Sequence, residues 1–301
     1  MKKRILVTGA KGLLGRKVIE VFHRESDYEI IATSSRKSKD VSVELDITNK
    51  ENVREVLSQF RPDIIINTAA YTNVDKAEEE RELAYLVNAT GVANLGEASR
   101  IYGSKVVQIS TDYVFDGVKG NYTEDSRPEP INYYGKTKLA GENLLKVQTD
   151  NYAIVRTQVL YGYAPDVKEN FALWVIDNLS VGKTIRVVTD QIGNPTLADE
   201  LAYALLKVCE KDVVGVYHFS GNEALSRYDF AKLIADVFSL PAELITPIKS
   251  SELSQPARRP SNSTFVCLKA KTELGIEIPP TISSIQVMKQ QMRRAGITIK
   301  V

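Results

Sequence analysis

Histidine and cysteine are scarce in this chain of 301 residues. The two histidines, His23 and His218, offer little material for a His-rich metal centre or a Ser-His-Asp triad, so we expect both to be structural and no metal to be bound. The two cysteines, Cys209 and Cys267, lie far apart and form no CxxC pair. This spacing argues against a disulfide framework and favours a reduced, cytoplasmic protein.

Long apolar runs and an excess of one charge are also missing. No window approaches the roughly 18 apolar residues of a membrane span, and the apolar run after the opening MKKR is too short for a signal peptide. Lys and Arg number 39 against 38 Asp and Glu, a net charge of +1. Such a balance provides no excess of positive charge that would indicate binding to a nucleic acid. We therefore expect neither a membrane nor a nucleic acid as partner.

Short β-branched runs alternate with longer helical patterns through the first two-thirds of the chain. Runs such as DIIIN and KVVQIS are continuously apolar, which is typical of parallel strands covered on both faces. The predicted strands are Arg4–Thr8, Glu29–Thr33, Val43–Asp46, Ile64–Thr68, Lys105–Ser110 and Tyr152–Arg156. The predicted helices lie near Leu13–Arg24, Glu51–Phe60, Arg81–Tyr102 and Tyr133–Val147. This alternation predicts an α/β fold with a doubly wound parallel sheet.

The phrase VTGAKGLLG follows the first predicted strand and opens the first predicted helix. It places Gly9, Gly12 and Gly15 three residues apart. Glycine permits a tight turn and lets backbone N–H groups approach a pyrophosphate at the helix N-terminus. The spacing is GxxGxxG and not the standard GxGxxG, so a purely structural turn stays an alternative. Its place between strand and helix favours a Rossmann-type dinucleotide site.

The end of the second strand bears on the choice of cofactor. An acid there would favour NAD, because it bonds the ribose 2′-hydroxyl and repels a phosphate. The chain reads TSSRK instead, with Arg36 and no acid, and Lys11 lies in the glycine loop. We therefore expect NADPH. NADH stays an alternative, as do two solvated surface cations.

The regular alternation of predicted strands and helices ends at about residue 159, and shorter predicted elements follow. We expect residues 1–160 to form the NADP-binding domain and residues 161–301 a smaller, interleaved substrate-binding domain. Residues 183–218 are expected to return to the first domain.

Three hydroxyl and amino side chains suggest a chemistry that needs no histidine. Tyr134 and Lys138 are four residues apart on a predicted helix and so share one face. An ammonium beside a phenol stabilises the phenolate, so we expect Lys138 to lower the pKa of Tyr134 from about 10. Thr111 ends a central strand and can hydrogen-bond the same substrate oxygen. The set suits hydride transfer to a ketone, with Tyr134 as proton donor.

Several longer phrases carry a family resemblance over nearly the whole chain: NTAAYTNVDKAEEERELAYLVNATGVANL, ISTDYVFDG, YYGKTKLAGE and DQIGNPT. With them the sequence resembles the dTDP-4-dehydrorhamnose reductase family of extended short-chain dehydrogenases/reductases. The resemblance implies NADPH-dependent reduction of the 4-keto group of a nucleotide-linked 6-deoxyhexose, as the last step to dTDP-L-rhamnose. A homodimer is an open alternative to a monomer.

The resemblance also implies site residues. The catalytic set is Thr111, Tyr134 and Lys138. The cofactor would be surrounded by Gly9, Lys11, Gly12, Leu13, Leu14, Arg36, Asp46, Ile47, Ala69, Ala70, Tyr71 and Lys138. The sugar would be approached by Thr72, Val74, Asp112 and Tyr113. Asp112 is followed by a tyrosine and not by the glutamate of nucleotide-sugar dehydratases, which favours simple reduction; a plain turn-forming role for Asp112 stays open.

The chain departs from the family at one place. RTQVLYG puts Val159 where the family usually keeps a tryptophan, and the only tryptophan, Trp174, is expected in the core.

The sequence is also similar to the β regulatory subunit of methionine adenosyltransferase, so a non-catalytic NADP-binding regulator is the alternative function. In QPARRPSN, Arg258 and Arg259 suit either a substrate diphosphate or a solvated loop.

Overall fold

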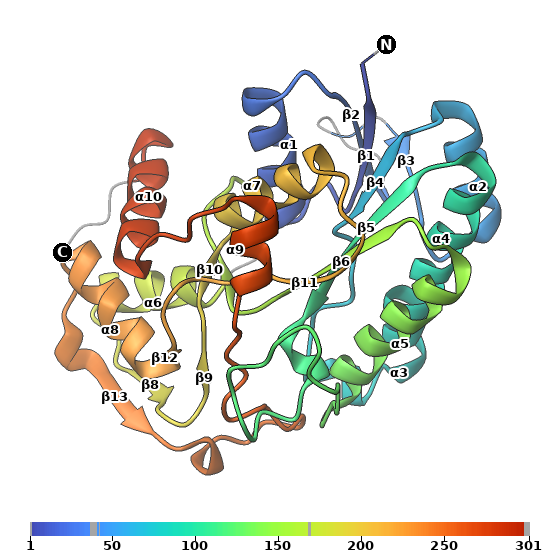
Figure 1. The fold of residues 1–301 in the computed structure, drawn as a ribbon. Helices are drawn as coiled ribbons and strands as arrows, with labels where there is room; N and C mark the ends of the chain where they lie inside the picture. Colours follow the sequence, from blue (N-terminus) through green and yellow to red (C-terminus); the bar gives the residue numbers. More distant parts are fainter. Residues whose placement is uncertain (1, 37–40, 42, 168–169, 298–301) are drawn as a thin grey trace.

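The computed structural model describes residues 2–36, 41, 43–167 and 170–297. Seven strands form a parallel central sheet in the order β11-β6-β5-β4-β1-β2-β3 (Figure 1). Their bounds are β1 Arg4–Thr8, β2 Glu29–Ser34, β3 Val43–Glu44, β4 Ile64–Asn67, β5 Lys105–Thr111, β6 Tyr152–Thr157 and β11 Gly215–His218. The predicted doubly wound α/β fold is confirmed.

Both faces of this sheet are buried, which explains the continuously apolar strands. In β1, Ile5 and Val7 belong to one hydrophobic layer and Leu6 to the other. The first layer is covered by α1 (Leu13–Glu25), α7 (Ala198–Glu210) and α9 (Leu268–Leu274). The second layer is covered by α2 (Lys50–Phe60), α4 (Gly91–Tyr102) and α5 (Tyr133–Gln148). Figure 1 shows the two sets of helices on opposite sides of the sheet.

The strand order reverses between β1 and β4, so their connections leave toward opposite faces of the sheet. Thr8 and Asn67 pair at the carboxyl ends of these two strands. In open α/β sheets, the crevice outside the carboxyl ends at such a switch point is where ligands bind. The fold therefore directs attention to this edge.

One predicted helix is divided in three. The stretch expected to be helical from Arg81 to Tyr102 consists of α3 (Arg81–Tyr85), a π-helical segment (Leu86–Thr90) and α4. A π-helical segment shifts the residues that follow around the helix axis, and such segments are frequent at functional sites. The short 3₁₀ turns are Lys76–Glu78, Asp112–Val114, Ala242–Leu244 and Ser250–Glu252.

A second group of elements lies beside the carboxyl edge of the sheet (Figure 1). It contains α6 (Phe171–Ser180), α8 (Arg227–Phe238) and α10 (Thr281–Arg294) around a separate hydrophobic core. Three strand pairs complete it: β7 (Leu160–Tyr161) with β10 (Thr196–Leu197), β8 (Ile185–Val188) with β13 (Ile245–Ile248), and β9 (Ile192–Gly193) with β12 (Leu225–Ser226). Trp174 packs against this core, as expected.

The chain passes between the two groups more than once. After β8 it returns to the sheet, where α7 packs on α1 and β11 pairs with β6. After β13 it returns again, because Asn262 donates its N–H to the Gly117 carbonyl oxygen (2.9 Å) and Tyr122 donates its own to the Thr264 carbonyl oxygen (2.8 Å). Residues of both groups therefore meet at the carboxyl edge.

Candidate active site

A cavity of about 910 Å³ opens at the carboxyl edge of the sheet. It runs from the glycine loop, past the ends of β4 and β5, to the start of α8. Every site residue expected from the sequence lines it: Gly9, Lys11, Gly12, Leu13, Leu14, Arg36, Asp46, Ile47, Ala69, Ala70, Tyr71, Thr72, Val74, Thr111, Asp112, Tyr113, Tyr134 and Lys138. The structure thus brings together residues as far apart in the chain as Gly9 and Lys138.

The glycine loop depends on the absence of side chains at two positions. Gly9 has a φ of +63°, and a Cβ placed there would lie 2.8 Å from the Ala69 nitrogen. A Cβ on Gly15 would lie 2.4 Å from the Gly9 carbonyl oxygen. Gly12 is the N-cap of α1 and donates its N–H to the Gly9 carbonyl oxygen at 2.9 Å. The first turn of α1 consequently presents its free N–H groups to the cavity, which suits a pyrophosphate.

The far end of the loop meets the end of β2. Lys11 Nζ donates to the Arg36 carbonyl oxygen at 2.9 Å, and Ser34 Oγ donates to the same oxygen at 2.5 Å. The Arg36 side chain is exposed at the rim. Asp46, on the other side, accepts hydrogen bonds from the N–H (2.9 Å) and the hydroxyl (2.7 Å) of Thr48. This end of the cavity therefore offers two cations, while the Asp46 carboxylate is engaged with its own loop.

Asn88 organises the middle of the cavity, and the sequence analysis missed it. It sits in the π-helical segment and is 2% exposed. Its amide accepts from the Tyr71 N–H (2.9 Å) and donates to the Tyr71 carbonyl oxygen (3.0 Å), holding the cavity wall after β4. It also donates to Thr137 Oγ1 on α5 at 3.0 Å. One side chain thus fixes the wall relative to the helix that carries Tyr134.

Helix α5 is positioned by its first turn. The Asn132 side chain caps it by accepting the Gly135 N–H at 2.8 Å. A Cβ on Gly135 would lie 2.0 Å from the Tyr113 carbonyl oxygen, so only glycine lets the helix approach so closely. The Tyr113 and Tyr134 rings meet edge to face at 5.7 Å. The Tyr134 phenol is thereby placed beside Thr111 and Asp112 at the end of β5.

The electrostatics of the phenol differ from the expectation. Burial raises the pKa of Tyr134 above its ordinary value, and the nearby Thr111 hydroxyl opposes this only in part. Lys138 Nζ donates to the Ile109 carbonyl oxygen at 2.7 Å, and burial lowers the pKa of this amine to about 8. The expected lowering of the Tyr134 pKa by Lys138 is therefore wrong for this structure, because the ammonium is directed at the backbone of β5.

A buried ion pair joins α5 to β6, beside the residues that line the cavity. Glu142 of α5 is fully buried and accepts from Arg156 of β6 through Nε (2.9 Å) and Nη2 (2.6 Å). Ser110 of β5 adds a hydroxyl at 2.6 Å from Glu142 Oε1. His218 lies 3.4 Å from Arg156 and is buried, which lowers its pKa to about 3. His218 is therefore a neutral core residue, as expected.

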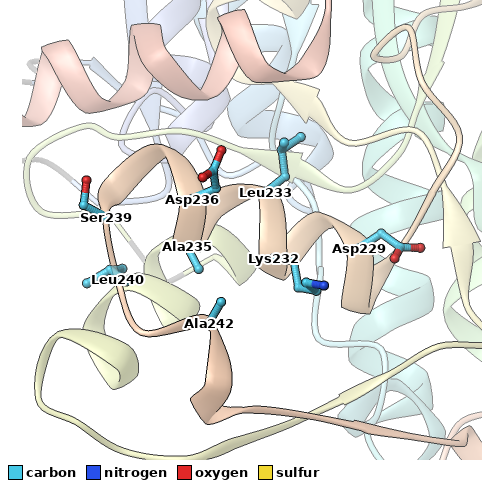
Figure 2. Close-up of a pocket in the computed structure, with 8 residues that line it drawn as sticks. All are labelled: Asp229, Lys232, Leu233, Ala235, Asp236, Ser239, Leu240 and Ala242. Atoms are coloured by element: carbon cyan, nitrogen blue, oxygen red, sulfur yellow. The ribbon is translucent and has the colours of Figure 1, made fainter.

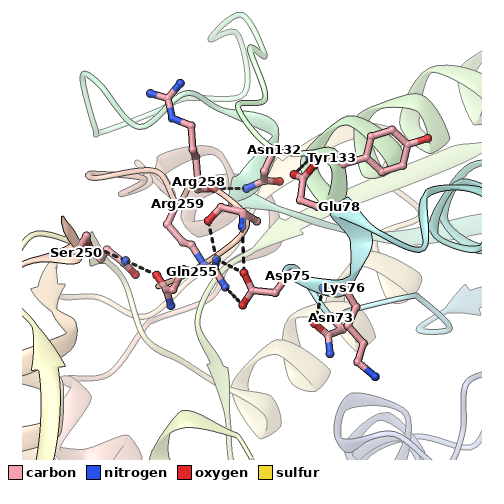
Figure 3. Close-up of polar contacts among 12 residues, drawn as sticks. Asn73, Asp75, Lys76, Glu78, Asn132, Tyr133, Ser250, Gln255, Arg258 and Arg259 are labelled. Carbon is pink, nitrogen blue, oxygen red and sulfur yellow. Dashed lines mark hydrogen bonds and ion pairs between the residues drawn. The ribbon is translucent and has the colours of Figure 1, made fainter. Parts of the chain in front are cut away.

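The loop that returns after β13 contacts the segment after β4 and the start of α5 (Figure 3). Arg259 forms a bidentate ion pair with Asp75, which also accepts the Ala257 N–H at 3.1 Å. The charge of Arg259 also acts on the Tyr113 phenol, where it opposes the rise in pKa that burial causes. Arg258 is exposed, and only its carbonyl oxygen is held, by Asn132 Nδ2 at 2.7 Å. Of the two arginines left open by the sequence, Arg259 is thus fixed by Asp75, one residue after the cavity-lining Val74.

Val159 lines the cavity in an unusual conformation. Its φ of +44° is rare for a β-branched residue. The buried Gln158 next to it accepts the Asn194 N–H at 2.9 Å and donates to the Asn194 side-chain oxygen at 3.3 Å. A Cβ on Gly193 would lie 2.6 Å from Gln158 Oε1, so the turn packs tightly against this amide. The Gln158–Asn194 contact holds Val159 in place.

A second hollow, of about 670 Å³, follows the outer side of α8 (Figure 2). Its lining combines Asp229, Lys232 and Asp236 with small side chains such as Ala235 and Ala242. It shares no lining residue with the first cavity. No group of three or more His, Cys, Asp or Glu suited to a metal ion occurs among the described residues. The first cavity, which holds Thr111, Tyr134 and Lys138, is therefore the candidate active site.

Comparison with known proteins agrees with this geometry. The model of the RmlD substrate binding domain matches residues 2–294. The chain belongs to this family. It is 38% identical to a dTDP-4-dehydrorhamnose reductase of Aggregatibacter actinomycetemcomitans, over 91% of this chain and 94% of that protein. It is 33% identical to methionine adenosyltransferase 2 subunit beta of Rattus norvegicus, over 91% of this chain and 83% of that one.

A solved structure of the RmlD family superposes closely. The crystal structure of dTDP-4-dehydrorhamnose reductase from Bacillus anthracis str. Ames in complex with NADP has a TM-score of 0.90 and 37% identity, covering 97% of this chain and all of that one. A UDP-glucose 4-epimerase of Thermus thermophilus in complex with NAD, at 21% identity and a TM-score of 0.83, shares the fold over 97% of this chain and 99% of that one. The resemblance predicted from the sequence phrases is confirmed.

The buried ion pair yields a prediction about stability. Glu142→Gln should lower the free energy of unfolding by about 3–5 kcal/mol, because it leaves the Arg156 charge buried without its partner. Glu97, which pairs with Lys50 and Arg54 at the surface, provides the matched control: Glu97→Gln should cost no more than about 1 kcal/mol. Urea unfolding measures both. Equal losses in the two variants would contradict the special weight given to Glu142.

Proposed function

We propose that this protein is an NADPH-dependent reductase acting on the 4-keto group of a nucleotide-linked 6-deoxyhexose, converting dTDP-4-dehydrorhamnose to dTDP-L-rhamnose. The observation that carries the proposal is the meeting of Thr111, Tyr134 and Lys138 in the cavity that the glycine loop opens. Support comes from the reductase of Aggregatibacter actinomycetemcomitans and from the Bacillus anthracis reductase that was crystallised with NADP.

The proposed roles follow the length of the cavity. The glycine loop and the start of α1 would hold the pyrophosphate, while Lys11 and Arg36 would meet the adenosine ribose and its phosphate. NADPH supplies a hydride to the ketone carbon when bound. Tyr134 gives a proton to the ketone oxygen, and Lys138 keeps a positive charge beside that reaction. Thr72, Val74, Asp112 and Tyr113 would contact the sugar.

The diphosphate of the substrate requires positive charge at the sugar end. Arg227, at the first turn of α8, lines the cavity there. Arg259 is held in place by Asp75 and adjoins Tyr113. Guanidinium groups fixed in this way suit phosphate oxygens, because little rotamer freedom is lost on binding. We assign the diphosphate contacts to these two arginines.

The decisive experiment is NADPH oxidation by the purified protein with dTDP-4-dehydrorhamnose, followed by product identification. Turnover supports the reductase. The 33% identity to methionine adenosyltransferase 2 subunit beta makes a cofactor-binding regulator the second candidate. Tight NADPH binding without turnover, together with a changed activity of an added methionine adenosyltransferase, would favour that regulator.

The division into residues 1–160 and 161–301, with residues 183–218 returning, stays a prediction. Within the returning segment, β8 pairs with β13 of the second group, whereas α7 and β11 lie against the sheet.

A homodimer and a cytoplasmic location also stay predictions, which size-exclusion chromatography and fractionation address. No helix of the described residues has the length and apolar character needed to cross a membrane.

Tyr134→Phe keeps the ring and its contact with Tyr113 but removes the proton donor. General acid catalysis is worth about 10²–10⁴-fold, so kcat should fall by that factor while NADPH still binds. Tyr133→Phe, on the preceding residue, is the control and should change kcat little. Stopped-flow absorbance of NADPH measures the step. Normal turnover by the Tyr134 variant would show that another group donates the proton.

Arg36→Ala should weaken NADPH binding much more than NADH binding, because only NADPH carries the 2′-phosphate that a cation attracts. Loss of a charge-assisted hydrogen bond corresponds to roughly ten-fold or more in affinity. Fluorescence titration with each cofactor measures the ratio. Arg100→Ala, at an exposed position near the end of α4, serves as the control. An unmodified protein that binds both cofactors equally would argue against NADPH preference.

Val159→Trp tests the sugar pocket. An indole in this place would add a flat wall, worth roughly 0.5–1.5 kcal/mol beyond plain area burial, or about ten-fold in affinity. The native protein should therefore show a high KM for the deoxyhexose substrate, and the variant a lower one. Val181→Trp, at an exposed position, is the control. Tight binding by the native protein that the tryptophan worsens would show that the pocket is not enlarged.

A further inference from the structure

The returning loop, residues 253–267 between the Ser250–Glu252 turn and α9, is held at the segment that follows β4 (Figure 3). Asp75 of that segment accepts hydrogen bonds from Arg259 Nη1 and Nη2 and from the Ala257 N–H at 3.1 Å. Asp75 is also the N-cap of the 3₁₀ turn Lys76–Glu78. One carboxylate therefore links the returning loop to this turn.

The same turn also contacts the helix that carries Tyr134. Glu78 Oε1 accepts the N–H of Tyr133, the first residue of α5, at 2.8 Å. The turn is thus linked to the returning loop through Asp75 and to α5 through Glu78. Two links that meet at one turn leave the angle between loop and helix open, as two sides do not fix a triangle. A direct contact between loop and helix would fix this angle.

Asn132 makes that direct contact. Its side chain is buried, with 3% of the residue exposed, and both ends of its amide are hydrogen-bonded. Nδ2 donates to the Arg258 carbonyl oxygen at 2.7 Å, and Oδ1 accepts the Gly135 N–H in the first turn of α5 at 2.8 Å. A carbonyl oxygen can only accept and an N–H can only donate, so the two partners allow one orientation of the amide. Asn132 therefore joins the returning loop to α5.

Helix capping alone does not require asparagine at this place. Aspartate and serine cap helices about as well, but an ionised aspartate has no N–H, and the serine side chain is one bond shorter. Asn49 shows a plain cap: its exposed side chain accepts the Asn52 N–H at 3.0 Å at the start of α2. The second hydrogen bond, to the Arg258 carbonyl oxygen, is what sets Asn132 apart.

The reaction requires a fixed spacing between the loop and the helix. The substrate diphosphate is assigned to Arg227 and Arg259, whereas the proton comes from Tyr134 on α5. A sugar nucleotide that is anchored by its diphosphate presents its ketone to the phenol only when these groups keep one distance. Misplacement of bound groups by about 1 Å can lower a reaction rate about 10²-fold.

We propose that Asn132 is a positioning residue for the reduction: its amide fixes the returning loop, with Arg259, against the first turn of α5, with Tyr134. The kinetic consequence rests on the proposed reductase function. Asn132 is not among the described residues that line the cavity, so it acts through the loop and the helix that it joins. Because Asp75 still holds the Arg259 guanidinium, loss of the Asn132 link should affect the hydride-transfer step more than substrate affinity.

Two substitutions separate this link from the helix cap. Asn132→Asp and Asn132→Ser both keep an oxygen for the Gly135 N–H, and neither can also donate to the Arg258 carbonyl oxygen. The aspartate adds a charge and the serine does not, so an effect that both share comes from the lost donor. In single-turnover NADPH oxidation with saturating dTDP-4-dehydrorhamnose, the rate should fall about ten-fold or more in both. The KM for the sugar nucleotide should change less than kcat, and NADPH affinity should stay as in the native protein.

The matched control lies at the start of α2. Asn49→Asp and Asn49→Ser make the same exchanges at an exposed cap and measure what a changed cap does by itself. Both should leave the rate of hydride transfer unchanged.

A second readout needs no substrate. Hydrogen–deuterium exchange of the full-length protein, followed by mass spectrometry, reports on the loop amides of Ala257, Asn262 and Ser263, which are hydrogen-bonded in the structure. Both Asn132 variants should raise the exchange rate of these amides about ten-fold, the size expected for one lost buried hydrogen bond. Amides within α5 should exchange as in the native protein, because its cap is kept.

Slower hydride transfer together with faster loop exchange in both Asn132 variants supports the proposal. If loop exchange rises but the native protein reduces no sugar nucleotide, the proposed function fails and the link between loop and helix stands. If the native protein is an active reductase and both variants transfer hydride at the native rate, the positioning role is overturned and the proposed function stands. Unchanged loop exchange in both variants also overturns the inference.

Discussion

The ion pair between Glu142 and Arg156 is the contact on which the site depends. It joins α5 to β6, and the Ser110 hydroxyl adds β5 to the same carboxylate. Tyr134 lies on the same helix as Glu142, about 12 Å away along the axis. Any shift of α5 against the sheet would therefore carry the phenol away from the end of β5. Both charged groups are buried, so separating them would leave each charge without its partner. The free-energy cost of that separation, more than the net stability of the pair, opposes such a shift.

The features that were predicted correctly depend on interactions between residues close together in the sequence. The central strands alternate between two buried layers, so each is apolar throughout, and the glycine loop obeys steric limits within a few residues of Gly9. Tyr134 and Lys138 share a helix face by spacing alone. The fold, the cavity-lining residues and the family were therefore predictable, because the pattern that indicates each of them lies within a short segment of the sequence.

What the sequence did not predict depends on contacts between distant segments. Asn88 hydrogen-bonds Tyr71 and Thr137, which lie 17 and 49 positions away. The residues around it in the sequence carry no pattern that predicts a π-helical segment. The Asp75–Arg259 pair spans 184 positions. The pKa of Tyr134 was misjudged because helical spacing says nothing about burial or about the Ile109 carbonyl that Lys138 binds. The two-residue strands of the second group are too short to show any periodicity.

The order of the chain has a consequence for how the protein is made. The layer under α1 is completed by α7, and the open side of β6 is covered by β11, which begins at Gly215. During synthesis, about 60 residues must therefore follow β6 before its exposed edge acquires a partner. Such an edge is a template for pairing with other chains. The first 160 residues, expressed without the remainder, would consequently present an unpaired β6 and an uncovered face of α1, and would be prone to aggregate.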